Sequence, residues 1–267
     1  MFDKFIKSVK DALFPTNYTC DVCGRETFGT NICPDCIKQL HFNNGNTCPV
    51  CGRMTILPEI CSECKNKLPA FKKAVSSLVY EGAAVALIAK YKNGYGYLKE
   101  YFADLLSEKI SGLPRPDLIV YVPMTKKAQR KRGYNQVKLL ADALSIRTGI
   151  PVVKNAVIKV KETAGQKGLS QKERESNLKG CFKVTDKNSV NGKTVLCLDD
   201  VLTTGATAEE MCKTLLKAGA KEVCFASVAS VEDKQQKKTR EENELRLKNT
   251  RKNIKNLSDN NKSAAEV

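Results

Sequence analysis

The chain has 267 residues, of which 42% are hydrophobic and 28% charged, and this composition supports one or two folded domains. No apolar run is long enough to span a bilayer, so we expect a soluble protein without a membrane span. The 45 Lys and Arg residues outnumber the 29 Asp and Glu residues and give a net charge of +16. Such an excess favours polyanionic partners, although a basic tail alone would produce the same charge.

Residues 1–18 are predicted to form a short helix. Apolar residues recur there at helical spacing, at Phe2, Phe5, Ile6, Val9 and Leu13. Charged residues interrupt this pattern and no small-residue cleavage site follows, so the segment does not resemble a signal peptide. We therefore expect a cytoplasmic protein whose first helix docks on the body, in preference to a membrane-surface anchor.

Eight of the twelve cysteines lie within the first 64 residues and form an internal repeat. Two Cys-x-x-Cys pairs, nine residues apart, recur 28 residues later in the same register. Each pair brings two thiolates to one side of a tight turn, and two pairs complete the tetrahedral sulfur site that suits Zn²⁺. The pattern predicts two structural zinc ions bound by Cys20, Cys23, Cys33, Cys36, Cys48, Cys51, Cys61 and Cys64.

The spacing leaves open which pairs share a zinc ion. Neighbouring pairs would form two stacked ribbons and alternate pairs a cross-braced module, and the shorter loops favour neighbours. This double zinc ribbon, residues 19–70, is either a structural clamp or, because of Lys38, Arg53, Lys65 and Lys67, a platform for DNA or protein. The other four cysteines are expected to be buried small hydrophobes: Cys181, Cys197, Cys212 and Cys224.

Strand and helix patterns alternate through residues 75–231. Strands are expected at 75–80, 117–122, 152–153, 157–158, 194–198 and 223–228, and helices at 83–91, 97–110, 137–144 and 208–215. This order predicts an α/β domain with a mostly parallel sheet covered by helices on both faces. Residues 232–267 have no aromatic and few large apolar side chains, which predicts a solvated charged tail, disordered or helical.

The stretch VLCLDDVLTTGAT, residues 195–207, is predicted to form a strand, a turn and the start of a helix. Ligands of parallel sheets bind beyond the carboxyl ends of the strands, where the amides of 203–207 would meet a phosphate and Gly205 would allow close approach. Asp199 and Asp200 repel a phosphate but suit the vicinal hydroxyls of a ribose, or a Mg²⁺ held through water. The stretch therefore predicts a ribose 5-phosphate site, and it lacks both the Walker loop and the dinucleotide fingerprint.

Three motifs together resemble the ComF/GntX family. VLCLDDVLTTGAT closely resembles the 5-phosphoribosyl-1-pyrophosphate (PRPP) motif of type I phosphoribosyltransferases. Residues 123–136, PMTKKAQRKRGYNQ, resemble the family's loop P-x-x-x-x-x-x-R-x-R-G-[FY]-N-Q. A third segment resembles its T-x-x-Q-x-x-L…R…N-x-x-G-x-F pattern through Thr163, Gln166, Leu169, Arg174, Asn177, Gly180 and Phe182. An N-terminal double zinc ribbon is a further hallmark, and the resemblance extends over residues 10 to 231.

The resemblance implies a type I phosphoribosyltransferase fold and a PRPP site. It implies ribose contacts and catalytic roles for the two aspartates, 5-phosphate contacts for the turn, and a Mg²⁺ bridging the pyrophosphate and the ribose hydroxyls. The PRPP-binding residues would be Asp199, Asp200, Val201, Thr203, Thr204, Gly205, Ala206 and Thr207. The basic loop after Pro123, with Lys126, Arg130 and Arg132, is the expected clamp for pyrophosphate oxygens. Residues 166–174 fall where such enzymes carry a mobile lid.

Two functions fit these observations. The first is transfer of a phosphoribosyl group from PRPP to an acceptor that the sequence does not identify. The family also implies a part in handling single-stranded DNA in competent bacteria. The second function is therefore a non-catalytic DNA-binding accessory protein for transformation, which acts with other competence proteins and retains the PRPP site. The substitution Asp200→Ala would abolish turnover in the first case and leave DNA uptake unchanged in the second.

Overall fold

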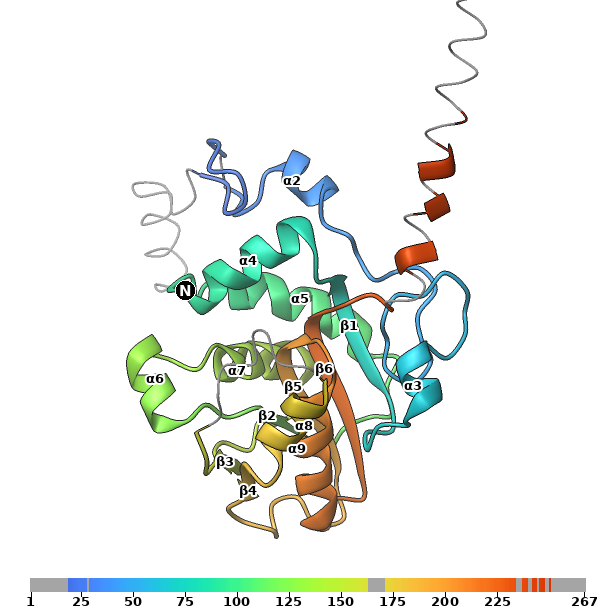
Figure 1. Ribbon diagram of the computed structural model, residues 1–267. Coiled ribbons are helices and arrows are strands. Elements are labelled where there is room, and N and C mark those ends of the chain that lie inside the picture. The colour runs from blue at the N-terminus through green and yellow to red at the C-terminus, as the bar shows by residue number, and fades with distance from the viewer. Residues whose placement is uncertain are drawn as a thin grey trace, which may run out of the picture.

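The described part of the chain is built around a four-stranded parallel sheet (Figure 1). The computed structural model describes residues 19–27, 29–162 and 171–233, and beyond these 237–239, 242–243, 245–247 and 250. The helix expected at 1–18, the motif residues Thr163, Gln166 and Leu169, and most of the charged tail lie outside the described residues.

The strands of the sheet follow the order β1-β6-β5-β2, and each neighbouring pair is parallel. They are β1 Ala74–Val79, β2 Leu118–Tyr121, β5 Thr194–Leu202 and β6 Glu222–Ser230. All four residues of β2 and all but the first of β6 are buried, as expected for parallel strands covered on both faces. An isolated bridge between Ile119 and Val152 stands where the sequence predicted a short strand.

Helices cover both faces of the sheet and confirm the predicted α/β class. The elements around the sheet are α4 Gly82–Lys92, α5 Leu98–Ile110, α7 Gln136–Thr148, β3 Val157–Lys159, α8 Gln171–Leu178, β4 Phe182–Val184 and α9 Ala206–Lys217. On one face, α4, α5 and α7 pack through Leu87, Phe102 and Leu140. On the other face, α9 packs through Met211 and Leu215 beside the antiparallel hairpin of β3 and β4, and α8 lies against α9.

The two cysteine repeats fold alike and pack into different apolar clusters. Each ends in a single helical turn, α2 (Pro34–Lys38) or α3 (Ser62–Asn66). The first ribbon joins the cluster of α4, α5 and α7, whereas the second joins the cluster of α9. In Figure 1, α2 accordingly lies next to α4, and α3 lies on the far side of β1. Neighbouring pairs group together in both ribbons, as the loop lengths favoured. The four remaining cysteines are fully buried, as predicted.

Strand β5 is longer than the sequence indicated. The prediction gave a strand from Thr194 to Leu198 that runs into the two aspartates, but the strand continues to Leu202. The cause is the neighbouring strand β6, whose residues from Ser227 to Ser230 pair with Asp199, Val201 and Leu202. The aspartates are therefore held in regular sheet structure, which fixes their backbone more firmly than a turn would.

The basic segment after Pro123 is a helix, although the sequence predicted a loop there. Helix α6 spans Lys126–Arg132. Thr125 caps its N-terminus by accepting a hydrogen bond from the amide of Ala128 at 3.2 Å. Gly133 ends it in the left-handed conformation, with a φ of 88°. These two local signals outweigh the repulsion among the basic side chains.

The first residues of the expected tail are buried against the body. Glu232 is 6% exposed and Asp233 is 0% exposed, so the solvated tail does not begin at residue 232 as predicted. The Asp233 carboxylate accepts hydrogen bonds from the amide and the hydroxyl of Ser62, at 2.8 and 2.7 Å. The chain leaving β6 thereby fastens α3 of the second ribbon. No helix in the described ranges is long and apolar enough to cross a membrane.

Candidate functional site

The turn between β5 and α9 consists of Thr203, Thr204 and Gly205. Gly205 is the N-cap of α9 and has a φ of 81°, which favours glycine. The hydroxyl of Thr204 accepts a hydrogen bond from the amide of Ala206 at 3.4 Å. The first N–H groups of any helix lack intrahelical partners and lie at the positive end of the helix dipole. The turn is therefore suited to bind an anion.

Asp200 is held in place by two residues from helices on the same face of the sheet, Lys92 of α4 and Gln136 of α7. Its Oδ1 lies 3.0 Å from the Lys92 ammonium, and its Oδ2 accepts a hydrogen bond from the Gln136 side chain at 2.6 Å. Asp200 as a whole residue is 6% exposed. Burial acts to lower the pKa of Lys92, but the charge and hydrogen bond of Asp200 outweigh it and raise that pKa above its usual value. Lys92 is thus held in its charged form, and both oxygens of the Asp200 side chain are oriented by a partner.

Asp199 lies in a different electrostatic environment from its neighbour. Burial, with a smaller contribution from the Asp200 charge, raises the pKa of Asp199 to about 7. An amide hydrogen bond from Asp200 at 2.8 Å and the charges of Lys92 and Lys159 act in the opposite direction. A carboxyl that titrates near neutral pH accepts hydrogen bonds from hydroxyl groups when ionised and can also donate one when protonated.

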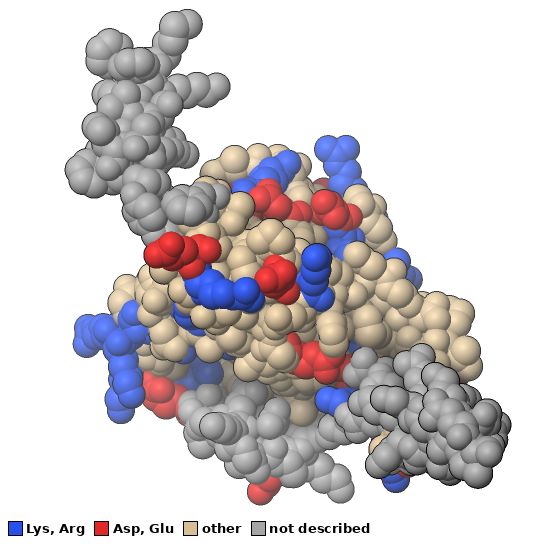
Figure 2. Space-filling model, turned by 90° about the horizontal axis from the view of Figure 1, so that it is seen from above, with Lys and Arg blue, Asp and Glu red and all other residues tan. Residues whose placement is uncertain are grey.

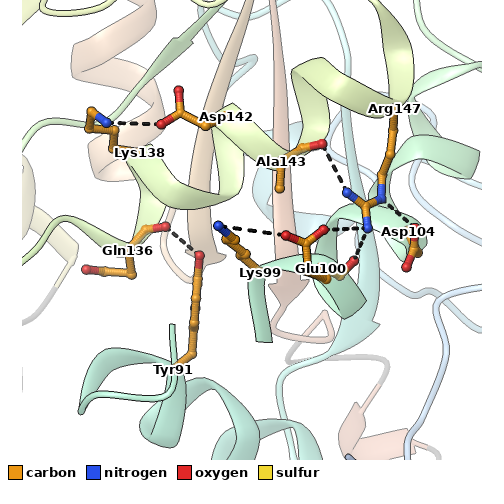
Figure 3. Close-up of polar contacts among 9 residues, drawn as sticks. All are labelled: Tyr91, Lys99, Glu100, Asp104, Gln136, Lys138, Asp142, Ala143 and Arg147. Atoms are coloured by element: carbon orange, nitrogen blue, oxygen red, sulfur yellow. Dashed lines mark hydrogen bonds and ion pairs between the residues drawn. The ribbon is translucent and has the colours of Figure 1, made fainter. Parts of the chain in front are cut away.

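The segment RGYNQ, residues 132–136, positions Asp200. Asn135 caps α7 by accepting a hydrogen bond from the amide of Val137 at 2.9 Å. The Gln136 carbonyl accepts a hydrogen bond from the Tyr91 hydroxyl at 2.5 Å, which joins α7 to α4 (Figure 3). The Gln136 side-chain oxygen accepts a hydrogen bond from Arg132 at 2.7 Å, which leaves the amide nitrogen to donate to Asp200. This segment therefore orients the Asp200 carboxylate, and its one basic residue, Arg132, takes part in that arrangement.

A basic cavity of about 810 Å³ lies beyond the end of β2. Apolar side chains, including Ile158 and Val160, and one acid, Glu162, contribute to its wall. The basic side chains that line it are Lys126, Lys127, Arg130, Lys138, Lys159 and Lys161. This surplus of positive charge suits a polyanionic group.

The thiols of both ribbons fit zinc. The four sulfur atoms of each group lie within 4.8 Å of one another, and Cys51 and Cys61 are separated by 3.5 Å. Tetrahedral Zn²⁺ with bonds of about 2.3 Å would place its sulfur ligands about 3.8 Å apart. Backbone amides donate to Cys20 and Cys48 at 3.3 and 3.4 Å, a second set of contacts that orients metal-bound thiolates.

The structure places the sequence-predicted residues in three groups. The aspartates and the turn lie together, and Lys126 and Arg130 line the basic cavity, but Arg132 is directed to Gln136. Val201 and Ala206 contribute to the apolar clusters on the two faces of the sheet, so they offer a ligand chiefly their backbone. Thr207 lies half-buried in the first turn of α9.

Sequence reasoning missed two side chains of this site. Lys92 carries no motif and was not identified as functional, because its partner is distant in the sequence. Gln136 lies in the segment that resembles the family loop, but the sequence alone indicates no contact for its side chain. The position of Gln136 directly after the helix cap Asn135 could have indicated a role. The residue after a cap lies at the N-terminal end of its helix, which in this fold is near the carboxyl ends of the strands.

Family models match both parts of the chain. The model of the double zinc ribbon domain matches residues 9–65, and that of the phosphoribosyl transferase domain matches residues 130–262. Among solved structures, glutamine PRPP amidotransferase from B. subtilis has a TM-score of 0.35 and 22% identity, covering 49% of this chain and 26% of that chain. Purine phosphoribosyltransferase from Pyrococcus horikoshii has a TM-score of 0.32 and 23% identity, covering 50% and 74%.

Three curated relatives are similar to parts of the chain. Competence protein F of Haemophilus influenzae is 40% identical over 124 residues, 46% of this chain and 54% of that protein. DNA utilization protein YhgH of Escherichia coli is 37% identical over 116 residues, 43% and 50% of the two chains. Competence protein ComFC of Bacillus subtilis is 30% identical over 102 residues, 38% and 39% of the two chains. The chain thus spans about half the length of the first two relatives.

Proposed function

Because the chain belongs to the ComF family, which joins a double zinc ribbon to a phosphoribosyl transferase domain, we propose that it binds PRPP at the end of β5. The observation that carries this proposal is Asp200, a buried carboxylate oriented by Lys92 and Gln136 three residues before the anion-binding turn. A ribose phosphate has the two features that this arrangement accepts: a diol for carboxylates and a dianion for backbone amides.

Each part of PRPP has a proposed partner. Asp199 and Asp200 accept hydrogen bonds from the ribose hydroxyls, and the amides and hydroxyls from Thr203 to Thr207 hold the 5-phosphate. Lys126 and Arg130 hold the pyrophosphate in the basic cavity, whose Lys159 is close enough to influence the pKa of Asp199. Mg²⁺ held through water by Asp199 and Asp200 would neutralise charge on the leaving pyrophosphate.

The proposed reaction is phosphoribosyl transfer to an acceptor still to be identified. The bond from ribose C1 to the pyrophosphate oxygen breaks, the pyrophosphate leaves with the electron pair, and the acceptor forms a new bond to C1 while losing a proton. Positive charge develops on the ribose near the aspartates, and negative charge develops beside the lysines of the cavity. Charge stabilisation of this kind can provide most of the catalysis. We place the reaction in the cytoplasm, where cysteine thiols stay reduced.

A second candidate function is binding of single-stranded DNA. It is supported by the basic cavity and by relatives whose names refer to DNA utilization and competence. On the face seen in Figure 2, however, basic and acidic side chains of the described residues are interspersed and form no continuous basic surface. DNA binding would therefore depend on the cavity or on residues elsewhere, in concert with other competence proteins.

Calorimetric titration with PRPP and Mg²⁺ tests the proposal. The wild-type protein should bind, and Asp200→Asn should bind about tenfold to hundredfold more weakly, because it loses charged hydrogen bonds to the ribose. Asp104→Asn is the control, because Asp104 of α5 pairs with Arg147 of α7 at 2.5 Å and neither residue lines the basic cavity. No heat with PRPP, together with binding of a single-stranded oligonucleotide, would replace the first function by the second.

A further inference from the structure

The two ribbons share an arginine–acid pair in the same register. Arg25 pairs with Asp35 in the first ribbon, and 28 residues later Arg53 pairs with Glu63 in the second. The first pair is exposed, with 62% and 59% of the two side chains accessible. Arg53, in contrast, is 3% exposed. The repeat therefore places the same ion pair in two environments, one exposed and one buried.

In the second ribbon, the arginine of this pair contacts the turn between β5 and α9. The Nη2 of Arg53 donates a hydrogen bond to the backbone carbonyl of Thr203, while its Nη1 contacts the Glu63 carboxylate of α3. The planar guanidinium can bind both groups at once because its N–H groups have a fixed fork geometry. Its Nε has no hydrogen-bond partner among the described residues, a cost that stability alone does not favour.

The hydrogen bond to Thr203 determines where the next amide points. In a trans peptide unit the carbonyl and the following N–H point in opposite directions. The structure has no cis peptide bonds in its described residues. Holding the Thr203 carbonyl on the side of the ribbon therefore directs the N–H of Thr204 away from the ribbon.

Further contacts join the second ribbon to the same turn. A cavity of about 60 Å³ separates them, lined on one side by Cys51 and Cys64 and on the other by Thr204 and Gly205. Glu209, in the first turn of α9, accepts a hydrogen bond from the amide of Ala70 at 2.6 Å, just beyond the ribbon. Two thiols of the second group thus lie across a small gap from the turn.

We infer that Arg53 is a positioning residue that holds the phosphate-binding turn in its binding conformation, and that the second zinc ribbon, unlike the first, is part of the PRPP site. The identity of the ligand in this inference rests on the proposed function, whereas the contact between Arg53 and Thr203 does not. Metal bound by the second ribbon fixes Arg53, which lies two residues beyond Cys51, and Arg53 fixes the turn. Loss of that metal would then weaken ligand binding without any change to a residue that touches the ligand.

The test compares Arg53→Lys with Arg25→Lys in the full-length protein. Lysine keeps the charge but lacks the planar fork, so its single nitrogen does not reproduce the contacts that Nη2 and Nη1 make separately to Thr203 and Glu63. Hydrogen exchange of the amides at 203–206 should be about tenfold faster in Arg53→Lys and unchanged in Arg25→Lys, with two zinc ions per chain in both. Affinity for PRPP and Mg²⁺ should fall about tenfold in Arg53→Lys alone.

The exchange measurement separates this inference from the proposed function, because it needs no ligand. If the wild-type protein does not bind PRPP, the proposed function fails, and exchange still decides whether Arg53 holds the turn. Equal exchange in the two variants would overturn the inference, as would unchanged affinity in a protein that binds PRPP. Should Arg53→Lys not fold, Glu63→Gln compared with Asp35→Asn provides the same test, with faster exchange expected only in Glu63→Gln.

Discussion

The two zinc ribbons have nearly the same local structure but contact different parts of the molecule. A bridge joins Thr19 to Glu26 in the first, and the corresponding bridge joins Thr47 to Met54 in the second. Both begin with an amide of the first cysteine bonded to the arginine carbonyl five residues later, at 2.7 and 2.8 Å. The spacing of the metal ligands is therefore enough to specify the ribbon fold.

Their contacts set them apart. The first ribbon leaves Cys23 exposed and meets the body through Asp21, which accepts a hydrogen bond from Tyr97 at 2.7 Å. The second has all four cysteines buried and meets the body through Arg53 and the turn after β5. A metal-bound unit that occurs twice thus makes different contacts in its two copies because of a few residues at its surface.

The largest expected effect is that of losing one zinc ion. Cys51→Ser should release the second ion and weaken PRPP binding more than about hundredfold, because the turn loses its support on that side. Cys23→Ser should weaken the first site but change PRPP affinity by less than about threefold. Metal analysis and calorimetry on the same samples measure both effects. Equal losses of affinity in the two variants would contradict the distinction between the ribbons.

A second effect is steric and concerns Gly24 and Gly52, which follow the same cysteine in each repeat. Both have positive φ, 74° and 67°, so alanine would cost about 1 kcal/mol at either position from the backbone alone. At Gly52 a Cβ would also lie 2.5 Å from the Ala74 carbonyl oxygen of β1, whereas at Gly24 it would meet nothing within 4 Å. Gly52→Ala should therefore destabilise the protein by about 3 kcal/mol or more.

Thermal and denaturant unfolding of the two alanine variants measures this difference. The zinc content must be matched, because a lost ion would add its own destabilisation. Similar free energies of unfolding for the two would mean that the second ribbon is not packed closely on β1.

Burial of Asp199 at the end of β5 should make the stability of the folded protein depend on pH. Asp199 is protonated in the folded protein below its pKa of about 7, but in the unfolded chain it ionises near its ordinary value of 3.8. The folded state thus binds the extra proton between these values, and stability falls as the pH rises through them. Asp199→Asn removes this dependence.

The melting temperature of Asp199→Asn should therefore exceed that of the wild-type protein by about 10 °C at pH 8, and this difference should fall to less than half at pH 5. Measurements without ligand in buffers of equal ionic strength provide the comparison. A difference that stays constant with pH would show that the carboxyl is not desolvated.

The smallest effect concerns the anchor of the first ribbon. Tyr97→Phe removes the hydroxyl that donates to Asp21, a carboxylate residue only 5% exposed. The expected loss is about 1 kcal/mol in the free energy of unfolding, since Lys90 at 4.0 Å remains near the carboxylate. PRPP affinity should not change. A tenfold loss of affinity would instead extend the PRPP site to the first ribbon.

The sequence predicted those parts of the fold that depend on local spacing. Cysteine pairs nine residues apart group as neighbours, and apolar periodicity located the strands of the sheet and the helices beside it. The extension of β5 to Leu202 was not predicted, because it depends on pairing with β6. Helix α6 was missed because its caps, Thr125 and Gly133, flank a segment rich in like charges.

The sequence predicted the motif residues of the candidate site but not the residues that hold them in place. Asp199, Asp200 and the turn lie within one stretch of thirteen residues, so the sequence alone indicates the groups that they could bind. Lys92 and Arg53 reach this site from distant parts of the chain, and the contact of Arg53 with Thr203 spans 150 residues. No periodicity or spacing in a single sequence encodes such contacts, because they arise only when the sheet and the ribbon pack together.

A crystal structure of the protein with PRPP and Mg²⁺ tests the central claim most directly. The account predicts the 5-phosphate within hydrogen-bond distance of the amides from Thr203 to Thr207, with ribose hydroxyls on Asp199 and Asp200. It also predicts an intact contact between Arg53 and Thr203 in that complex. Electron density for the ligand elsewhere, with the two carboxylates unoccupied and the turn closed against the body, would contradict it.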